Sequence, residues 1–497
     1  MENSDWELLP KYHAMSLDPQ AGGGSSLDPP QSLGAPHADS GEGEENAGTP
    51  AIHRIPIELI CEILISTLPY LSRLGSRTVE QVPWHLGHIC QQWRAAAIMS
   101  PLLWSSFTLS RRSAGCSSQT DLQTKVETQL RRSGSAPLHV VIDLLQREGD
   151  IVGQWFPETA VDLIIDQCHR WETACLTLNH ASARQLGTRL ARMKDRLPRL
   201  RLLELVGRRV DDSLTETFAT APRLETVYLC RCSLRPGSIS CETQFPWAQV
   251  TKFRASYAYI EEFEGIFAAM NLAHVIEMGM FVEFLPAVNN TLHVVLPNLY
   301  RLNAKGSLPY ITAPLLQELW ITDHNESLWE LPRFVQRSAC RLSKLVVYGC
   351  CDTSAVIRAL ETLPTLKTFF ISFPHLSGIG DPKSLFRALD MSSSETTLCP
   401  KLTHIATGNN SENEISLFLD MVESRKQKSF HCSESLGEPE TCSAPSFVRV
   451  FHHGDMVNEV SEDTHRRVDG MRNEGLDIAL DSHFIPSSHN YLDCDRP

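Results

Sequence analysis

Apolar residues recur at helical spacing from about residue 55 onward. The stretch "AIHRIPIELICEILIST" predicts an amphipathic helix whose apolar stripe contains Ile55, Leu59, Ile60, Ile63 and Leu64. Pro56 suits the first turn of that helix, where a missing N–H costs nothing. A second helical pattern, "WHLGHICQQWRAAAIMSP", ends at Pro101. Residues 51–110 are therefore expected to form a small helical bundle that needs a neighbour or partner to cover its apolar faces.

The pattern then alternates between helix and strand. "DLQTKVETQL" has helical periodicity, "GSAP" interrupts it, and "LHVVIDLL" reads as a strand. From about residue 197 one phrase returns: proline, any residue, leucine, two variable residues, then apolar residues in alternation, as in "PRLRLLEL" and "PTLKTFFI". Its leading apolar positions are Leu200, Leu224, Val250, Leu272, Leu299, Leu316, Leu342, Leu366 and Leu402.

This repeat predicts a stack of parallel strands. No single unit can bury its own apolar face, whereas neighbouring units about 4.8 Å apart can bury a continuous one. Segments between the strands, such as "DTSAVIRALETLP", have helical periodicity and can cover the outer side. The pattern resembles the leucine-rich repeat family over roughly residues 135–425. It lacks most of the asparagines or cysteines that follow the leucines in that family, which favours an irregular solenoid; an ordinary α/β domain is the alternative.

The expected fold class is α/β, with a small N-terminal helical bundle followed by an irregular leucine-rich-repeat-like solenoid over residues 111–425. Glycine, proline, serine and acidic residues dominate residues 1–50, which are expected to be a disordered tail. Further segments are predicted from composition: a polar loop at 426–445, a strand–helix–strand cap at 446–482 and a tail at 483–497.

Charge and hydropathy exclude some partner classes. The chain of 497 residues has a net charge of −14, which argues against nucleic acid or an anionic membrane as its main partner. No run approaches the roughly 18–20 apolar residues that span a bilayer. The start "MENSDWELLPKYH" lacks the order of a signal peptide. The expected location is the cytoplasm, the nucleus or both.

Candidate catalytic or metal chemistry is weak. The fifteen cysteines include no C-x-x-C pair, so reduced, partly buried thiols are expected rather than a zinc site. Gly-rich phosphate loops, G-x-S-x-G and H-E-x-x-H are absent from the sequence. Adjacent histidines in "FHHGD" would point to opposite faces of a strand. We therefore expect no cofactor, no metal and no catalysis; a hydrolase with an atypical α/β fold is the weaker alternative.

The first segment becomes interpretable beside the repeats. "IPIELICEILI" followed by "HICQQWRAAAIMSPLLWSSFTL" resembles an F-box, in the F-box-like form common in fungal (basidiomycete-type) families. Ile55 and Pro56 stand where that family has Leu-Pro, and an insertion, "LPYLSRLGSRTVEQVPW", separates the two helices. The matching residues, which the resemblance implies bind an adaptor, are Ile55, Pro56, Leu59, Ile60, Ile63, Leu64, Ile89, Trp93, Leu103 and Trp104.

The resemblance implies the substrate-recognition subunit of an SCF (Skp–cullin–F-box) ubiquitin ligase. The F-box would dock a Skp-type adaptor that leads to a cullin scaffold, and the repeats would hold an unknown protein substrate. A repeat scaffold without ligase association is the alternative. Aromatic and charged residues near the strands are the usual anchor types, and the candidate substrate contacts are Tyr228, Arg254, Tyr300, Trp320 and Tyr348.

Overall fold

The computed structural model describes most of one compact unit, Ile55–Pro497. The predicted tails at 1–50 and 483–497, and the insertion between the first two helices, lie outside the described residues. The described ranges are 55–67, 89–110, 119–144, 158–178, 186–207, 216–230, 245–257, 264–282, 293–322, 326–349, 352–373, 382–392, 398–408, 411–434, 443–451 and 460–481.

One parallel sheet of 14 strands organises the chain. Strands follow one another in sequence order across the sheet, except that β8 (Val294–Val295) and β10 (Ile311–Thr312) pair separately. The 14 strands are β1 (Ser106–Ser110), β2 (Leu138–Asp143), β3 (Trp171–Thr177), β4 (Leu202–Val206), β5 (Thr226–Cys230), β6 (Lys252–Tyr257), β7 (Glu277–Val282), β9 (Arg301–Lys305), β11 (Glu318–Ile321), β12 (Lys344–Tyr348), β13 (Thr368–Ser372), β14 (His404–Gly408), β15 (Phe447–Phe451) and β16 (Asp477–Asp481).

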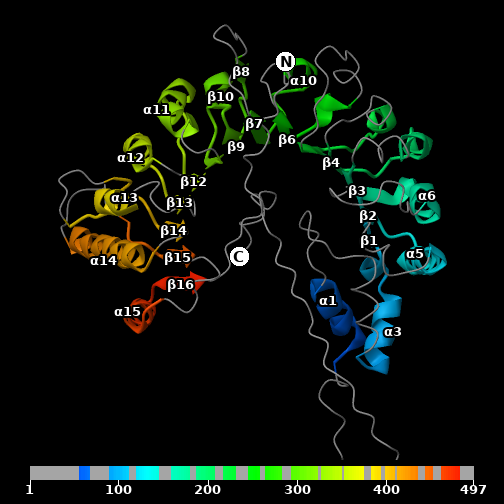
Figure 1. Ribbon diagram of the computed structural model, residues 1–497, viewed down its shortest axis with the longest axis horizontal. Coiled ribbons are helices and arrows are strands. Elements are labelled where there is room, and N and C mark those ends of the chain that lie inside the picture. The colour runs from blue at the N-terminus through cyan, green and yellow to red at the C-terminus, as the bar shows by residue number, and fades with distance from the viewer. Residues whose placement is uncertain are drawn as a thin grey trace, which may run out of the picture. The chain divides into compact units, whose positions relative to one another are not determined.

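Helices and short 3-10 turns connect successive strands and lie on one side of the sheet, the outer side in Figure 1. They are α5 (Gln119–Ser133), α6 (Glu158–Asp166), α10 (Glu264–Ala269), α11 (Glu326–Ser338), α12 (Thr353–Glu361), α13 (Pro382–Leu389), α14 (Glu412–Glu434) and α15 (Glu462–Asn473). Before them come α1 (Ile57–Thr67), α3 (Gln91–Met99) and the 3-10 turn η2 (Pro101–Trp104). The predicted α/β class with parallel strands and outer helices is confirmed.

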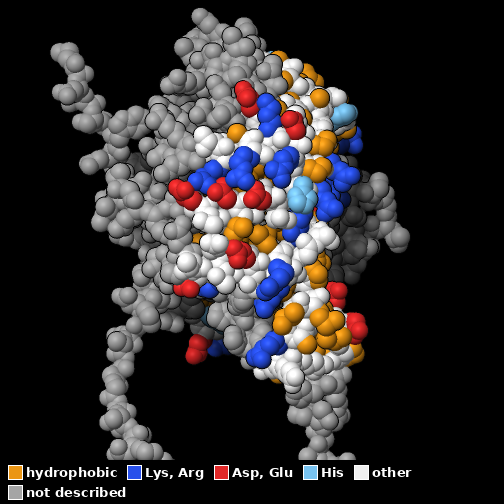
Figure 2. All heavy atoms as spheres, turned by 90° about the vertical axis from the view of Figure 1, so that its right-hand side faces the viewer, with side chains coloured by type: hydrophobic (Ala, Val, Ile, Leu, Met, Phe, Trp, Pro, Cys, Tyr) orange, Lys and Arg blue, Asp and Glu red, His pale blue; other side chains and the backbone are white. Residues whose placement is uncertain are grey.

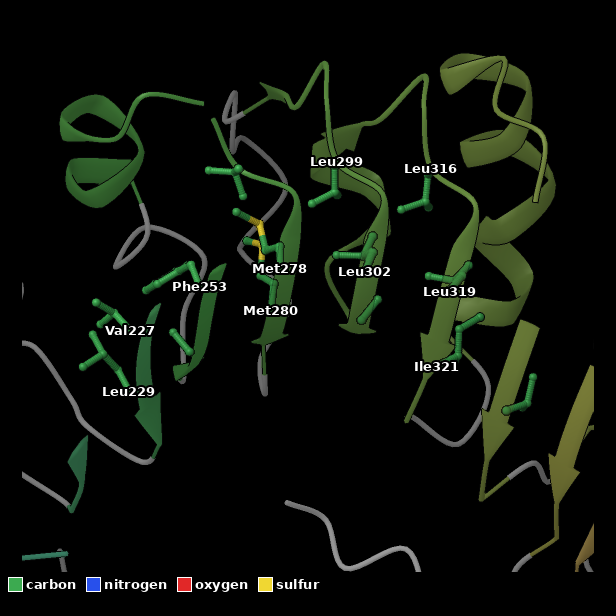
Figure 3. Close-up of a cluster of buried hydrophobic side chains, with 14 of the residues drawn as sticks. Val227, Leu229, Phe253, Met278, Met280, Leu299, Leu302, Leu316, Leu319 and Ile321 are labelled. Carbon is green, nitrogen blue, oxygen red and sulfur yellow. The ribbon is translucent and has the colours of Figure 1, made fainter. Parts of the chain in front are cut away.

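The repeat phrase sets the register of the sheet. Its leading residue comes two positions before each strand and is buried in the layer between strands and helices, as at Leu200, Leu224, Leu342 and Leu366. Because Leu202 pairs with Thr226 and Lys344 with Thr368, these leucines occupy equivalent places on neighbouring strands. Figure 3 shows the resulting layer across β5 to β11, where side chains such as Leu302 and Leu319 lie side by side.

One leading position was predicted three residues too early. The strand β7 begins at Glu277, so the place two residues before it belongs to Val275, which is fully buried. Leu272, the predicted residue, is only partly buried and packs at the edge of the core. This unit has two apolar residues, Leu272 and Val275, that could lead the phrase, and it has no proline to distinguish between them.

Two segment boundaries also differ from the sequence prediction. Residues 106–110, assigned to the N-terminal bundle, form β1 and pair with β2, so the sheet begins there. Residues 426–434, predicted as part of a polar loop, continue α14 to Glu434. The helix persists because Arg425 anchors its middle, although its last turns are too polar to show an apolar stripe.

The Arg425 side chain is completely buried, and its guanidinium binds backbone carbonyls. It donates to the carbonyls of Leu389 (2.9 Å), Cys399 (3.1 Å) and Leu398 (2.5 Å), and so ties α14 to the segment that leads into β14. Cys399 has a left-handed backbone (φ 48°), and burial raises the pKa of its thiol to about 12 although the nearby Arg425 charge lowers it. A buried arginine thus fixes a strained corner.

Helix α12 supplies a test at low pH. The Asp352 carboxylate accepts from the backbone N–H groups of Ser354 (3.0 Å) and Ala355 (3.3 Å), which caps the helix. Hydrogen bonds from the Ser354 side chain hold the pKa of Asp352 below its usual range. Asp352→Ala is expected to lower the free energy of unfolding by about 1 kcal/mol at pH 7.

A lowered folded-state pKa means that the contribution of Asp352 is present above its unfolded pKa of about 3.9 and is lost as pH falls through the lower folded value. Urea unfolding of both proteins at pH 7 and below about pH 3 checks this: the difference should shrink at the acidic pH. A difference that stays constant would contradict the capping role.

Candidate protein-docking surfaces

The N-terminal bundle is built around a small core of its own. Ile60 and Leu64 of α1 pack against Ala96 and Ala97 of α3, together with Trp104 and its neighbour on η2. Gln92 of α3 donates to the carbonyl of Ile55 just before α1 at 2.9 Å, and the Trp104 indole N–H of η2 donates to the Ala97 carbonyl of α3 at 2.7 Å. The structure therefore brings both predicted helices and the closing turn into one unit.

Not all the predicted adaptor-binding residues are on the surface of this bundle. Ile60, Leu64, Leu103 and Trp104 are at most 1% exposed and form its core. They position the surface residues and cannot themselves touch a partner while the bundle stays folded. The sequence pattern marks a helix face as apolar but cannot separate the half of the face that packs inward from the half that remains exposed.

The exposed residues form an apolar ridge across both helices. Leu59 is 55% exposed, Ile89 52% and Ile63 38%, while Pro56 is exposed and Ile55 and Trp93 are half-buried. Sequence reasoning missed three further members, Ile98, Met99 and Leu102, of which Met99 is 68% exposed. We call these six residues the apolar ridge: Leu59, Ile63, Ile89, Ile98, Met99 and Leu102. Figure 2 shows hydrophobic side chains gathered over this end of the chain.

The bundle is joined to the first repeat by polar and aromatic contacts. Arg132 of α5 places its guanidinium 4.3 Å from the centre of the Trp104 ring, and Gln129 donates to the Ser106 carbonyl at 2.6 Å. Beyond α5 the same face becomes charged, with rows of basic and acidic side chains in Figure 2. There Arg189 and Arg192 pair with Glu158, Asp162 and Asp166 of α6. The ridge is therefore bordered by a paired charged surface.

The second surface is the face of the sheet that bears no helices, which we call the helix-free face. Its residues alternate along each strand with those of the main core, so the register places one residue per strand in a continuous middle row. That row runs through Glu204, Tyr228, Arg254, Gly279, Asn303, Trp320, Val346, Phe370, Ala406 and Arg449.

Three of the predicted substrate contacts, Tyr228, Arg254 and Trp320, lie in this middle row, and Tyr348 lies on the same face of β12, two residues after the middle row. Trp320 forms an apolar cluster with Val346 and Phe370 that is separate from the main core. The fifth residue, Tyr300, precedes β9 and donates its hydroxyl to Glu318 at 3.2 Å. The structure thus unites four of the five predicted contacts on one face.

Long cationic side chains lie over the aromatic residues of this face. The Arg301 guanidinium and the Lys344 ammonium are each 5.0 Å from the centre of the Trp320 ring. Arg254 extends across Gly279 and reaches within 4.9 Å of the centre of the Phe281 ring. Because Trp320 is only 2% exposed, such desolvated contacts contribute about 2 kcal/mol each.

Chemistry beyond binding has little support in the described part of the chain. The described residues include no group of three or more His, Cys, Asp or Glu arranged to hold a metal ion. The seven described cysteines are thiols, and burial raises the pKa of Cys175 well above its usual range and that of Cys340 to about 11. A protonated, buried thiol is a poor nucleophile. Within the same residues, no helix combines the length and the hydropathy that crossing a membrane requires.

Comparisons with known proteins add a distant likeness only. No family description and no curated protein sequence matches the chain. Among solved structures, one similar chain belongs to the "Crystal structure of TLR13-ssRNA13 complex", with 16% sequence identity and a TM-score of 0.33. The match covers 63% of this chain and 39% of that chain, so it spans well under half of that protein. Any function proposed for this chain therefore depends on its own residues.

Proposed function

We propose that this protein is the substrate-recognition subunit of an SCF ubiquitin ligase. Its N-terminal bundle docks a Skp-type adaptor, which links it to a cullin scaffold, and its repeats hold a protein substrate. The chain itself contributes binding and no catalysis. The seven cysteines whose side chains the structure describes are thiols, which is in keeping with a reducing compartment, the cytoplasm or the nucleus.

The apolar ridge is the observation that carries the proposal. Single exposed leucines and isoleucines are ordinary, but six large apolar side chains are exposed on or beside two packed helices and the next turn, which makes this small bundle a candidate interface. Burying a Leu or Ile side chain fully is worth about 1.5–3 kcal/mol, so covering several half-exposed ones can support stable docking. Ridges on one helix pair suit the grooves of a helical partner.

A single charge on the ridge tests adaptor docking. Ile63→Asp is expected to weaken association with a Skp-type adaptor at least about 100-fold, because an unpaired carboxylate would be buried in an apolar contact. Co-purification and titration of the full chain with the adaptor measure this change.

The matched control is Val295→Asp, which puts the same charge on an apolar residue of the repeats that is 52% exposed. The control should bind the adaptor as the unaltered protein does. Equal binding by Ile63→Asp would show that the ridge is not the docking face. Complete failure of the unaltered protein to bind an adaptor would favour the repeat scaffold without ligase association.

A further inference from the structure

One polar side chain on the helix-free face lacks any hydrogen-bond partner. Asn303, in the middle of β9, is 2% exposed, and both its amide nitrogen and its amide oxygen are unpaired. A buried, unpaired amide costs several kcal/mol in an apolar environment, and such groups are rare in native structures. A ligand that pairs with both amide atoms would remove this cost.

A second unpaired polar atom lies on the adjoining strand of the same face. One carboxylate oxygen of Glu277 is buried without a hydrogen-bond partner, while the other is 3.5 Å from the Lys252 ammonium. Between the two positions is Gly279, the register partner of Asn303. Because Gly279 has no side chain, the backbone of β7 is open there except for the Arg254 side chain that lies across it.

The charge of this part of the face differs from that of the whole chain. On β6 to β12 the helix-free face has more basic than acidic side chains: Lys252, Arg254, Arg301, Lys305 and Lys344 against Glu277 and Glu318. The chain as a whole has a net charge of −14. A partner that binds this face gains most if its own side chains are acidic.

We propose that the helix-free face over β6 to β12 binds an extended acidic segment of another protein, and that Asn303 pairs with one main-chain peptide group of that segment. A primary amide both donates and accepts, so its nitrogen can bond to a peptide C=O while its oxygen accepts from a peptide N–H. Glu277 can accept a further hydrogen bond from the same segment. This inference rests on the proposed function, since it specifies what the repeats recognise.

The same segment can open the site. Arg254 lies over one register neighbour of Asn303, and Arg301 and Lys344 lie over the other, Trp320. Arg301 already donates to the Glu318 carboxylate at 2.8 Å, so Arg254 and Lys344 are the cations to which carboxylates on the incoming segment offer stronger partners than an aromatic ring does. When the cations move to them, the amide of Asn303 becomes accessible to the main chain of the segment.

Synthetic peptides test the proposal on the full-length protein. Two libraries of 12-residue peptides alternate apolar residues with either Asp/Glu or Lys/Arg. The protein is expected to bind peptides of the acidic library. Asn303→Leu, which keeps the side-chain shape, is expected to lower the affinity for the selected peptide about tenfold. The matched control is Asn473→Leu, an exposed asparagine at the end of α15 that should leave affinity unchanged.

Methylating the peptide nitrogens one at a time identifies the main-chain contact. At one position, N-methylation of the peptide should lower its affinity for the unaltered protein about tenfold. The same methylation should not lower the affinity for Asn303→Leu any further. The melting temperature separates binding from structure: Asn303→Leu should keep or raise it, since the substitution removes an unpaired buried amide. A fall in melting temperature without loss of affinity would make Asn303 a structural residue.

Other results overturn the proposal directly. They are equal affinity of Asn303→Leu, preference for the basic library, or Asn303-dependent binding of a 12-residue oligouridylate in place of the peptides. Adaptor co-purification is measured on the same variant. If peptides fail while the adaptor still binds, only this inference is wrong; if the adaptor fails while peptides bind, the ligase role is wrong and the peptide site stands.

Discussion

Replacing Arg425 by methionine is expected to lower the free energy of unfolding by about 3 kcal/mol. Methionine fills a similar volume but leaves the carbonyls of Leu389, Leu398 and Cys399 without their donor. Each buried carbonyl that loses its partner costs about 1–3 kcal/mol, and removing a buried charge recovers part of that sum. Urea unfolding at pH 7 measures the change.

Arg466→Met is the matched control, because Arg466 is largely exposed and, among the described residues, pairs with Asp463 on its own helix. Surface pairs of that kind contribute less than about 1 kcal/mol. If Arg425→Met were as stable as this control, water would have to satisfy the three carbonyls, and Arg425 would not be the anchor of α14.

Truncating Trp104 to alanine is expected to destabilise the N-terminal bundle by about 3–5 kcal/mol. The indole is 1% exposed, donates to Ala97 and lies beneath Arg132, so its loss opens a cavity and separates the bundle from α5. The repeats have their own core, which does not include Trp104. The damage should therefore remain local, and adaptor binding should fall with it.

Amide hydrogen exchange resolves the location of the effect. Exchange should accelerate in α1 and α3 and stay unchanged in β9 to β13. Trp104→Phe, which keeps one six-membered ring but loses the five-membered ring and its N–H, should cost less than Trp104→Ala. Trp329→Ala is the control, because Trp329 is 45% exposed, and it should lower the free energy of unfolding by about 1 kcal/mol. Uniform acceleration throughout the sheet would show that bundle and repeats unfold as one unit.

The periodicity of leucines predicted the sheet because each strand packs against the core in the same way. A residue two positions before the strand must be apolar and buried, and this requirement repeats in every unit from Leu200 to Leu402. In the unit before β7, which has no proline, the same reasoning predicted Leu272 although Val275 occupies the buried place. The end of α14 was missed for a different reason: its anchor is a charged residue, Arg425, which sequence patterns assign to the surface.

The candidate site was predictable in part. The sequence offered aromatic and cationic residues on the strands as contacts but left open which face they occupy, and the register places Tyr228, Arg254, Trp320 and Tyr348 on the helix-free face. Asn303 was missed because an asparagine inside a strand carries no signal by itself; only the lack of a partner in three dimensions distinguishes it. For the bundle, the sequence identified the right helices but not the exposed half of each, so Met99 and Leu102 were overlooked.

Because all 14 strands run in parallel and follow sequence order, every strand delivers its carboxyl end to the same edge of the sheet. The chain that leaves this edge reaches the next strand after very different lengths, from Lys305 to Glu318 between β9 and β11 to Gly408 to Phe447 between β14 and β15. An insertion or deletion there alters neither the leucine before the next strand nor its pairing. The sequence at this edge can therefore change in one repeat at a time during evolution. New binding residues can arise there while the sheet and its core stay the same.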